Sequence, residues 1–363
     1  MAENFALYRK YRPANFSEVL GQDHVISVLE KSVADRRVSH AYLFSGPRGS
    51  GKTSVARILA RAVNCQSPAS IPCGKCEICR DFISGNTLDL VEIDAASNRG
   101  IDEVRALKEY AYLAPAHAAR KTYIIDEIHM MTKDAFNALL KILEEPPAHI
   151  LFIMATTEPE KLLETVVSRT QHFRFKPLTE MTIQKSLLSV AKKEGMELAK
   201  EAAGMISFFA DGSLRDALNY LAQVAAAGNG KIGENEIHAV LGVPPVKLVE
   251  AITEAIFSKN SELAYQSICE LEKSGGGGQL MLKVLLRNFR HLLLLSLNPP
   301  MRDGLKEQLA EREYNFLLGK LGLMPAAELE RTLTILLESA SQRFQSPYPT
   351  LQLELAIARI LQK

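Results

Sequence analysis

Residues 40–53, His-Ala-Tyr-Leu-Phe-Ser-Gly-Pro-Arg-Gly-Ser-Gly-Lys-Thr, decide the fold of this 363-residue chain. The apolar run at 41–45 is typical of a buried strand, and the residues after 53 have helical spacing. Between them stands the pattern G-x-x-x-x-G-K-[ST], formed by Gly46, Pro47, Arg48, Gly49, Ser50, Gly51, Lys52 and Thr53. A strand, a glycine-rich loop and a helix in this order predict a phosphate-binding loop in an α/β domain.

The composition of this loop indicates a nucleotide as the ligand. Its glycines let backbone N–H groups approach phosphate oxygens, and the start of the following helix adds partial positive charge. Lys52 is expected to reach the β- and γ-phosphates of ATP, and the Thr53 hydroxyl to bind the accompanying Mg²⁺. The alternative is a glycine-rich turn without a ligand. This interpretation is weaker, because Lys52 and the following helix stand where the phosphate-binding motif requires them.

The composition is that of a globular chain with two or three domains, since 47% of residues are hydrophobic and 23% are charged. The formal net charge is only +1, so attraction to nucleic acid requires local basic patches. No signal-peptide pattern opens the chain, which predicts a cytoplasmic protein. The most apolar helical stretch, 280–297, carries Lys283, Arg287, Arg290 and His291. We therefore expect a buried bundle helix there, with no membrane partner.

Five apolar, β-rich runs occur in the first half and alternate with helical patterns: residues 41–45, 88–93, 122–125, 150–155 and 172–175. This alternation predicts a parallel sheet covered by helices on both faces. After residue 177 we expect no further strands. The sequence predicts a sheet-containing domain over 1–177, a small helical domain over 178–242 and an all-helical domain over 243–363.

Four cysteines fall together in a short, loop-like insert at about 64–80: Cys65, Cys73, Cys76 and Cys79. Thiolates at this spacing can converge on one tetrahedral ion, and four of them make a closed structural zinc site. Disulfides are the first alternative, but a cytoplasmic protein rarely keeps them. An iron–sulfur cluster is the second, although the later Cys-Pro of a ferredoxin pattern is missing. Cys269 is expected to be a core thiol.

Two acids, Asp126 and Glu127, directly follow the apolar run at 122–125. Two acids at a strand end are common, but behind a phosphate-binding loop they indicate the second half of an ATPase site. Asp126 is then expected to hold the magnesium shell, and Glu127 to orient and deprotonate the attacking water.

Several short motifs accompany the phosphate-binding loop and the inserted cysteine module. These motifs are YRKYRP at 8–13, FSEVLGQ at 16–22, DEIH at 126–129, ATT at 155–157, SR at 168–169 and GSLRDAL at 212–218. With them the chain resembles, over essentially its whole length, the clamp-loader ATPases of the AAA+ superfamily, and among them the gamma/tau family of bacterial DNA polymerase III. The implied fold is an AAA+ sheet domain, a small helical lid domain and an all-α collar domain.

The resemblance also implies roles for three further residues. Thr157 would be the first sensor, bonded to the γ-phosphate or the water, and Arg215 the second sensor, touching the nucleotide from the lid. Arg169 would be the arginine finger of a neighbouring subunit's site. A planar, permanently charged guanidinium suits both arginine roles, whereas the alternative for each is a structural ion pair. Many family members have cysteine after the Ser-Arg pair, and here Thr170 follows.

Two contact regions are implied in the same way. Tyr11, Pro13 and Val19 resemble an adenine pocket, and part of this set is expected to be core. Arg99 and Arg105, at a helix start after the second strand, would hold DNA phosphates without reading bases.

The implied function is that of a DNA-stimulated ATPase motor subunit that places a sliding clamp on primed DNA. Its partners would be like and related subunits in a hetero-oligomeric ring, with the polymerase core and the replicative helicase reached through a further C-terminal region. A helicase is one alternative, because residues 126–129 mimic a D-E-x-H box, although the helical half shows no second RecA-like lobe. A scaffold that binds ATP without turnover is the other, and intact Lys52, Asp126 and Glu127 argue against it.

Overall fold

The structure, a computed structural model, describes residues 6–67, 71–97, 107, 109–228, 231–298, 311–342 and 346–362. The chain divides into two compact units. The first comprises Met1–Val190 and Ser207–Ala222, and the second comprises Ala191–Ile206 and Gln223–Lys363.

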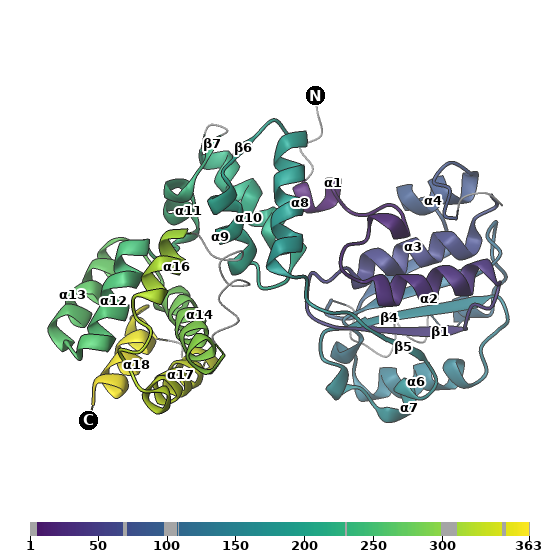
Figure 1. Cartoon of the computed structure of the whole chain (residues 1–363). Helices are drawn as coiled ribbons and strands as arrows, with labels where there is room; N and C mark the ends of the chain where they lie inside the picture. The colour runs from purple at the N-terminus through teal and green to yellow at the C-terminus, as the bar shows by residue number, and fades with distance from the viewer. Residues whose placement is uncertain are drawn as a thin grey trace. The chain divides into compact units, whose positions relative to one another are not determined.

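A five-stranded parallel sheet forms the centre of the first unit (Figure 1). Its strands are β1 (Ala41–Ser45), β2 (Leu90–Asp94), β3 (Lys121–Asp126), β4 (Ile150–Thr156) and β5 (Gln171–Arg174), in the order β2-β3-β4-β1-β5. Every neighbouring pair is parallel, which confirms the predicted α/β class. All five predicted strands are present. The second begins two residues later than predicted, and the fifth lies one residue nearer the N-terminus.

Alternate side chains of β1 face two separate cores. Tyr42 and Phe44 belong to a core shared with α2 (Asp23–Ala34) and α3 (Lys52–Asn64). Leu43 belongs to a core shared with α6 (Lys133–Glu144). Because side chains alternate along a strand, a sheet covered on both faces needs apolar residues at every position. This explains why all five β1 residues are buried and why the run is continuous in the sequence.

Short helices complete the first unit between these larger elements. They are α1 (Leu7–Lys10), η1 (Phe16–Glu18), α4 (Glu77–Ser84), η2 (Ile128–Met130), η3 (Pro159–Lys161) and α7 (Glu164–Val167).

The carboxyl ends of the strands lie side by side at one edge of the sheet, with Ser45 beside Thr156 and Asp94 beside Asp126. In open parallel sheets this edge is where ligands bind.

The turn that leads into β3 is held by one buried carboxylate, Asp89, which is 1% exposed. It accepts hydrogen bonds from the backbone N–H groups of Ala116, His117 and Ala118 at 2.7, 2.8 and 2.8 Å. Burial raises the pKa of Asp89, but these three donors and nearby Lys121 outweigh that effect and lower it. An ionised Asp89 therefore fixes where β3 begins, and through β3 where Asp126 and Glu127 stand.

The prediction that the strands end after residue 177 is wrong at one place. Glu197–Leu198 (β6) pairs in parallel with Lys231–Ile232 (β7). Each strand has two residues, which is too short to produce a recognisable period in the sequence. The helices of this stretch are α8 (Glu180–Lys193), α9 (Lys200–Phe209), α10 (Leu214–Ala227) and α11 (Glu234–Leu241).

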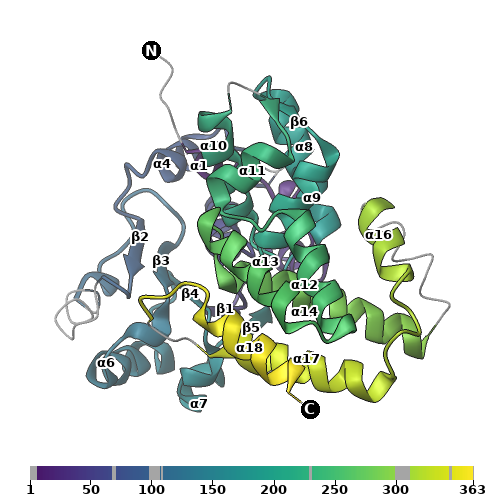
Figure 2. The same cartoon turned by 90° about the vertical axis from the view of Figure 1, so that its left-hand side faces the viewer.

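The remaining described chain is helical (Figure 2). Its helices are α12 (Val246–Ser258), α13 (Ser261–Lys273), α14 (Gly278–Leu297), α16 (Glu311–Leu318), α17 (Ala326–Ser341) and α18 (Leu351–Leu361). The predicted bundle helix is α14, which packs against α12, α17 and α18. Phe289 of α14 is fully buried and stacks on Phe257 with ring centroids 5.8 Å apart. None of the helices in the described parts of the chain is long and apolar enough to cross a membrane.

Candidate nucleotide site and cysteine cluster

The glycine-rich loop runs from the end of β1 to the start of α3 and depends on its glycines. Gly46, Gly49 and Gly51 have φ values of 144°, 73° and 102°, in the region that glycine adopts without steric cost. A Cβ on Gly46 would lie 2.4 Å from the Phe175 carbonyl oxygen, and one on Gly49 would lie 1.9 Å from Ser213 Oγ. The loop therefore fits closely between the residue that follows β5 and the segment before α10.

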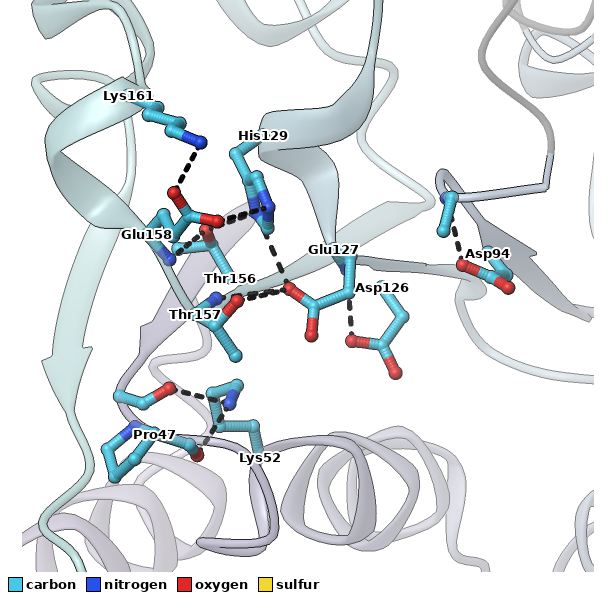
Figure 3. Close-up of polar contacts among 12 residues, drawn as sticks. Pro47, Lys52, Asp94, Asp126, Glu127, His129, Thr156, Thr157, Glu158 and Lys161 are labelled. Carbon is cyan, nitrogen blue, oxygen red and sulfur yellow. Dashed lines mark hydrogen bonds and ion pairs between the residues drawn. The ribbon is translucent and has the colours of Figure 1, made fainter. Parts of the chain in front are cut away.

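Lys52 lies at the start of α3 with only 6% of its surface exposed. Its Nζ donates hydrogen bonds to the carbonyl oxygens of Gly46 at 2.7 Å and Pro47 at 2.9 Å (Figure 3). Burial lowers the pKa of Lys52, and nearby Glu127 and Asp126 partly oppose that shift. The ammonium group is thus held inside the curve of the loop, next to backbone N–H groups that can cradle an anion.

Thr53 and Asp126, the two predicted magnesium ligands, are in direct contact. Thr53 Oγ1 donates to Asp126 Oδ2 at 2.8 Å, which joins the start of α3 to the end of β3. The second carboxylate oxygen, Oδ1, accepts from the Glu127 backbone N–H at 3.0 Å. A hydroxyl and a carboxylate are the hard oxygen ligands that Mg²⁺ prefers, so this pair fits the ion.

Glu127 follows β3 in a strained backbone conformation, with φ 48°. A non-glycine residue in this region costs about 1–2 kcal/mol, a cost that proteins usually retain at functional sites. Glu127 Oε2 accepts from Thr157 N at 3.1 Å and from Thr157 Oγ1 at 2.9 Å (Figure 3). The structure therefore joins the predicted water-activating residue to the predicted first sensor.

Arg169 follows α7 on the surface of the first unit, with 34% of its side chain exposed. Its Nη2 donates to Glu144 Oε1 at 2.7 Å and its Nη1 to the Thr165 carbonyl at 3.0 Å. These partners lie on α6 and α7, whereas the phosphate-binding loop lies between β1 and α3. About a third of the Arg169 side chain therefore faces solvent, while both of its terminal nitrogens have partners within the first unit.

Arg215 lies in the first turn of α10, and its guanidinium carbon is 4.8 Å from the centre of the Tyr8 ring. Ser213, two residues earlier, is the residue whose hydroxyl approaches Gly49. The beginning of α10 thus lies against the phosphate-binding loop at Ser213, and the Arg215 side chain lies over Tyr8.

Of the five remaining predicted contact residues, the structure describes Tyr11, Pro13 and Val19. Val19 is 9% exposed and belongs to the core that also contains Phe16, so it is one of the core residues expected in this set. Tyr11 and Pro13 are half-buried near α1. Arg99 and Arg105 lie outside the described residues.

Two sets of residues in this region were not predicted. Gln22 is fully buried, and it donates to the carbonyls of Lys176 at 2.7 Å and Ser50 at 3.4 Å. It ties the loop to the chain after β5. His129, Thr156 and Glu158 form a second group beside Glu127. Gln22 and His129 both lie in quoted motifs, but their partners come from distant segments that the sequence alone does not bring together.

The four insert cysteines converge, with all four Sγ atoms within 4.8 Å of one another. A tetrahedral zinc ion with Zn–S bonds of about 2.3 Å holds its sulfur atoms about 3.8 Å apart, so the cluster fits a metal after small adjustments. The Cys76 and Lys75 N–H groups donate to Cys73 Sγ at 3.3 and 3.4 Å and lower the pKa of Cys73 to about 6. All five cysteines are free. Cys269 is half-buried on α13.

Together the fold and the site define a phosphate-loop nucleotide-binding protein of the α/β class. Two family models match its two successive parts. Residues 21–179 match the model described as DNA polymerase III, delta subunit. Residues 182–230 match the model described as DNA polymerase III clamp loader subunit, ATPase lid domain.

Similar curated proteins narrow this class to one family. The chain is 37% identical to the gamma subunit of DNA polymerase III from Buchnera aphidicola over 81% of each chain. It is 36% identical to the tau subunit of DNA polymerase III from Bacillus subtilis over 98% of this chain. The chain belongs to the gamma/tau family of DNA polymerase III subunits, as its sequence motifs predicted. It spans 63% of the length of the Bacillus subtilis relative.

Among solved structures, the chain is similar to the RuvB Holliday junction branch migration motor of Thermotoga maritima. The TM-score is 0.49 at 20% identity, over 67% of this chain and 80% of that one.

Proposed function

We propose that this chain is an ATPase motor subunit of the DNA polymerase III clamp loader, which uses ATP binding and hydrolysis to load a sliding clamp on primed DNA. The proposal depends mainly on one observation: the phosphate-binding loop and the Asp126-Glu127 pair, which are far apart in the sequence, meet at one edge of the sheet. Thr53, at the start of α3, donates a hydrogen bond to Asp126 at the end of β3. Glu127, the next residue after Asp126, accepts a hydrogen bond from the Thr157 hydroxyl. Family membership and the clamp-loader lid model support the same assignment.

In this proposal each side chain has a separate task. Lys52 exchanges its two carbonyl partners for β- and γ-phosphate oxygens, a stronger charge-assisted contact. Thr53 and Asp126 would hold Mg²⁺, which supplies charge neutralisation of the phosphates when bound. Glu127 takes a proton from the attacking water while Thr157 restrains its carboxylate. Arg215 contacts the nucleotide from the lid, and Arg169 of a neighbouring subunit completes the site.

The proposed partners follow from the same family. Like and related subunits would form a hetero-oligomeric ring, held together by the helices of a collar domain over 243–363. The lid domain, proposed over 178–242, contains the segment matched by the lid model at 182–230. Sliding clamp and primed DNA would be the substrates of loading. The polymerase core and the replicative helicase would be further partners.

ATP turnover measured with and without clamp and primed DNA tests the proposal. We expect slow hydrolysis by the assembled complex alone, at least a severalfold increase when both are added, and no strand displacement on a forked duplex. Unwinding of the duplex would favour a helicase. ATP binding without phosphate release under any condition would favour a scaffold.

The cysteine cluster is proposed to be a structural zinc site held by Cys65, Cys73, Cys76 and Cys79. Cys79 is fully buried, and burial raises its pKa to about 12, so a cation is needed to stabilise it as a thiolate. Four protein ligands leave no open position for water, so zinc here would organise the insert between α3 and α4 without taking part in hydrolysis.

Metal analysis and metal removal test the zinc assignment. We expect one zinc per chain, no visible absorbance from iron, and a lower melting temperature after chelation, since zinc binding to such sites contributes folding free energy. Cys79→Ser should lose the metal and melt earlier, whereas Cys269→Ser should keep it. A wild-type chain that contains no zinc when purified from zinc-supplemented cells would contradict the assignment.

A further inference from the structure

His129 lies between two carboxylates, directly beside the site (Figure 3). Its side chain is only 4% exposed. Nδ1 is 2.9 Å from Thr156 Oγ1 and 3.4 Å from Glu127 Oε2, and Nε2 is 3.4 Å from Glu158 Oε1. These partners stand at the end of β3, at the end of β4 and in the segment that follows β4. One buried ring therefore links two adjacent strand ends.

The outer carboxylate, Glu158, is itself fixed in place. Its backbone N–H donates to Thr156 Oγ1 at 3.0 Å, and its side chain pairs with Lys161 of η3. The hydrogen bond from Lys161 lowers the pKa of Glu158 and keeps it ionised. An ionised carboxylate only accepts hydrogen bonds, so a favourable contact places a proton on Nε2 of His129. Nδ1 then carries no proton and accepts a hydrogen bond from the Thr156 hydroxyl, so the ring restrains Glu127 Oε2 by packing against it at 3.4 Å, without a hydrogen bond to it.

Glu127 needs restraint on more than one side to work as a base. Its side chain is 29% exposed and contains three rotatable bonds, so it has several conformations in which no oxygen faces an attacking water. Thr157 holds Oε2 from the β4 side. His129 approaches the same oxygen from η2, and its ring cannot move without breaking the contacts with Thr156 and Glu158.

We propose that His129 is a positioning residue for Glu127: anchored by Thr156 and Glu158, its ring keeps the carboxylate where it can accept a proton from water. The role rests on the proposed ATPase function and adds a residue to that same site. Within the described parts of the chain, the polar partners of His129 are Thr156, Glu127 and Glu158, and of these only Glu127 has a proposed role in hydrolysis, so His129 acts through Glu127.

The test is steady-state ATP hydrolysis by the assembled clamp-loader complex carrying His129→Ala. We expect kcat to fall by up to about 100-fold, the size of effect that misplacing a reacting group by an ångström produces. KM and ATP affinity should stay unchanged, because Lys52 and Thr53 are untouched. His129→Asn places an amide near the position of Nδ1 and should restore most of kcat. His149→Ala is the matched control, since His149 bonds the Ala111 carbonyl at the other end of the strands.

The outcomes separate this role from the proposed function. If the wild-type complex hydrolyses ATP, Glu127→Gln abolishes that hydrolysis and His129→Ala leaves kcat unchanged, the positioning role is wrong and the ATPase assignment stands. Equal losses in kcat and ATP affinity with no rescue by His129→Asn would show a merely structural histidine, which also overturns the role. If the wild-type complex does not hydrolyse ATP, the proposed function and the positioning role are both wrong.

Discussion

Glu127→Gln is expected to abolish ATP turnover while leaving ATP binding intact. Glutamine has nearly the same shape, and its amide oxygen can still accept from Thr157 N and Oγ1, which now bond Glu127 Oε2. It cannot take a proton from water at neutral pH. Loss of a general base costs roughly 10²–10⁴-fold in rate, so kcat should fall to near background.

Phosphate release and nucleotide binding by the same preparation measure this effect. Glu160→Gln is the matched control, because Glu160 is an exposed carboxylate in η3 that is expected to leave turnover unchanged. Turnover within threefold of wild type in the Glu127→Gln complex would contradict the assignment of Glu127 as the base. Loss of nucleotide binding would instead indicate that Glu127 holds the ligand.

Arg169→Ala is expected to remove turnover stimulated by clamp and primed DNA, again without loss of ATP binding. An arginine finger is worth about 10³–10⁵-fold in rate, because its guanidinium neutralises charge that develops on the transferring phosphoryl group. Arg169 lies on the surface, paired with Glu144 at 2.7 Å. An exposed ion pair of this kind contributes about 0–1 kcal/mol, so a purely structural role predicts almost no effect on hydrolysis.

Glu144→Ala separates the two interpretations of Arg169. It breaks the same ion pair but leaves the guanidinium free to reach a neighbouring site, so stimulated turnover should persist. Arg37→Ala, at an exposed arginine just after α2, controls for loss of surface charge. If Glu144→Ala reproduces the full loss seen with Arg169→Ala, the ion pair matters and the finger role is refuted.

The sequence predicts those parts of the site whose chemistry is contiguous along the chain. The phosphate-binding loop and the Asp126-Glu127 pair are each adjacent residues next to a recognisable strand, so spacing and residue type are enough. The same holds for the cysteine cluster, in which Cys73, Cys76 and Cys79 recur at intervals of three. The five strands of the sheet were predictable because burial on both faces makes each run continuously apolar.

Other parts depend on contacts between distant segments, which no local pattern records. Gln22 reaches Lys176, 154 residues away, and His129 reaches Thr156, 27 residues away. Gly49 must be glycine because Ser213 approaches it, a constraint invisible without the fold. β6 and β7 were missed for another reason, since two-residue strands have no periodicity. Val19 was predicted to line the adenine pocket but packs in the core. The sequence alone does not distinguish an apolar residue that lines a pocket from one that packs in the core.

Subunit mixing tests the central claim most directly, namely that ATP on one subunit's loop is hydrolysed with an arginine from the next subunit. Complexes are assembled from a mixture of Arg169→Ala and Glu127→Gln chains, each inactive by itself. Where an Arg169→Ala chain provides the loop and Glu127, and a Glu127→Gln neighbour provides Arg169, one complete site forms. We predict that the mixture recovers a substantial fraction of stimulated turnover. A mixture as inactive as its two components would contradict a site shared between subunits.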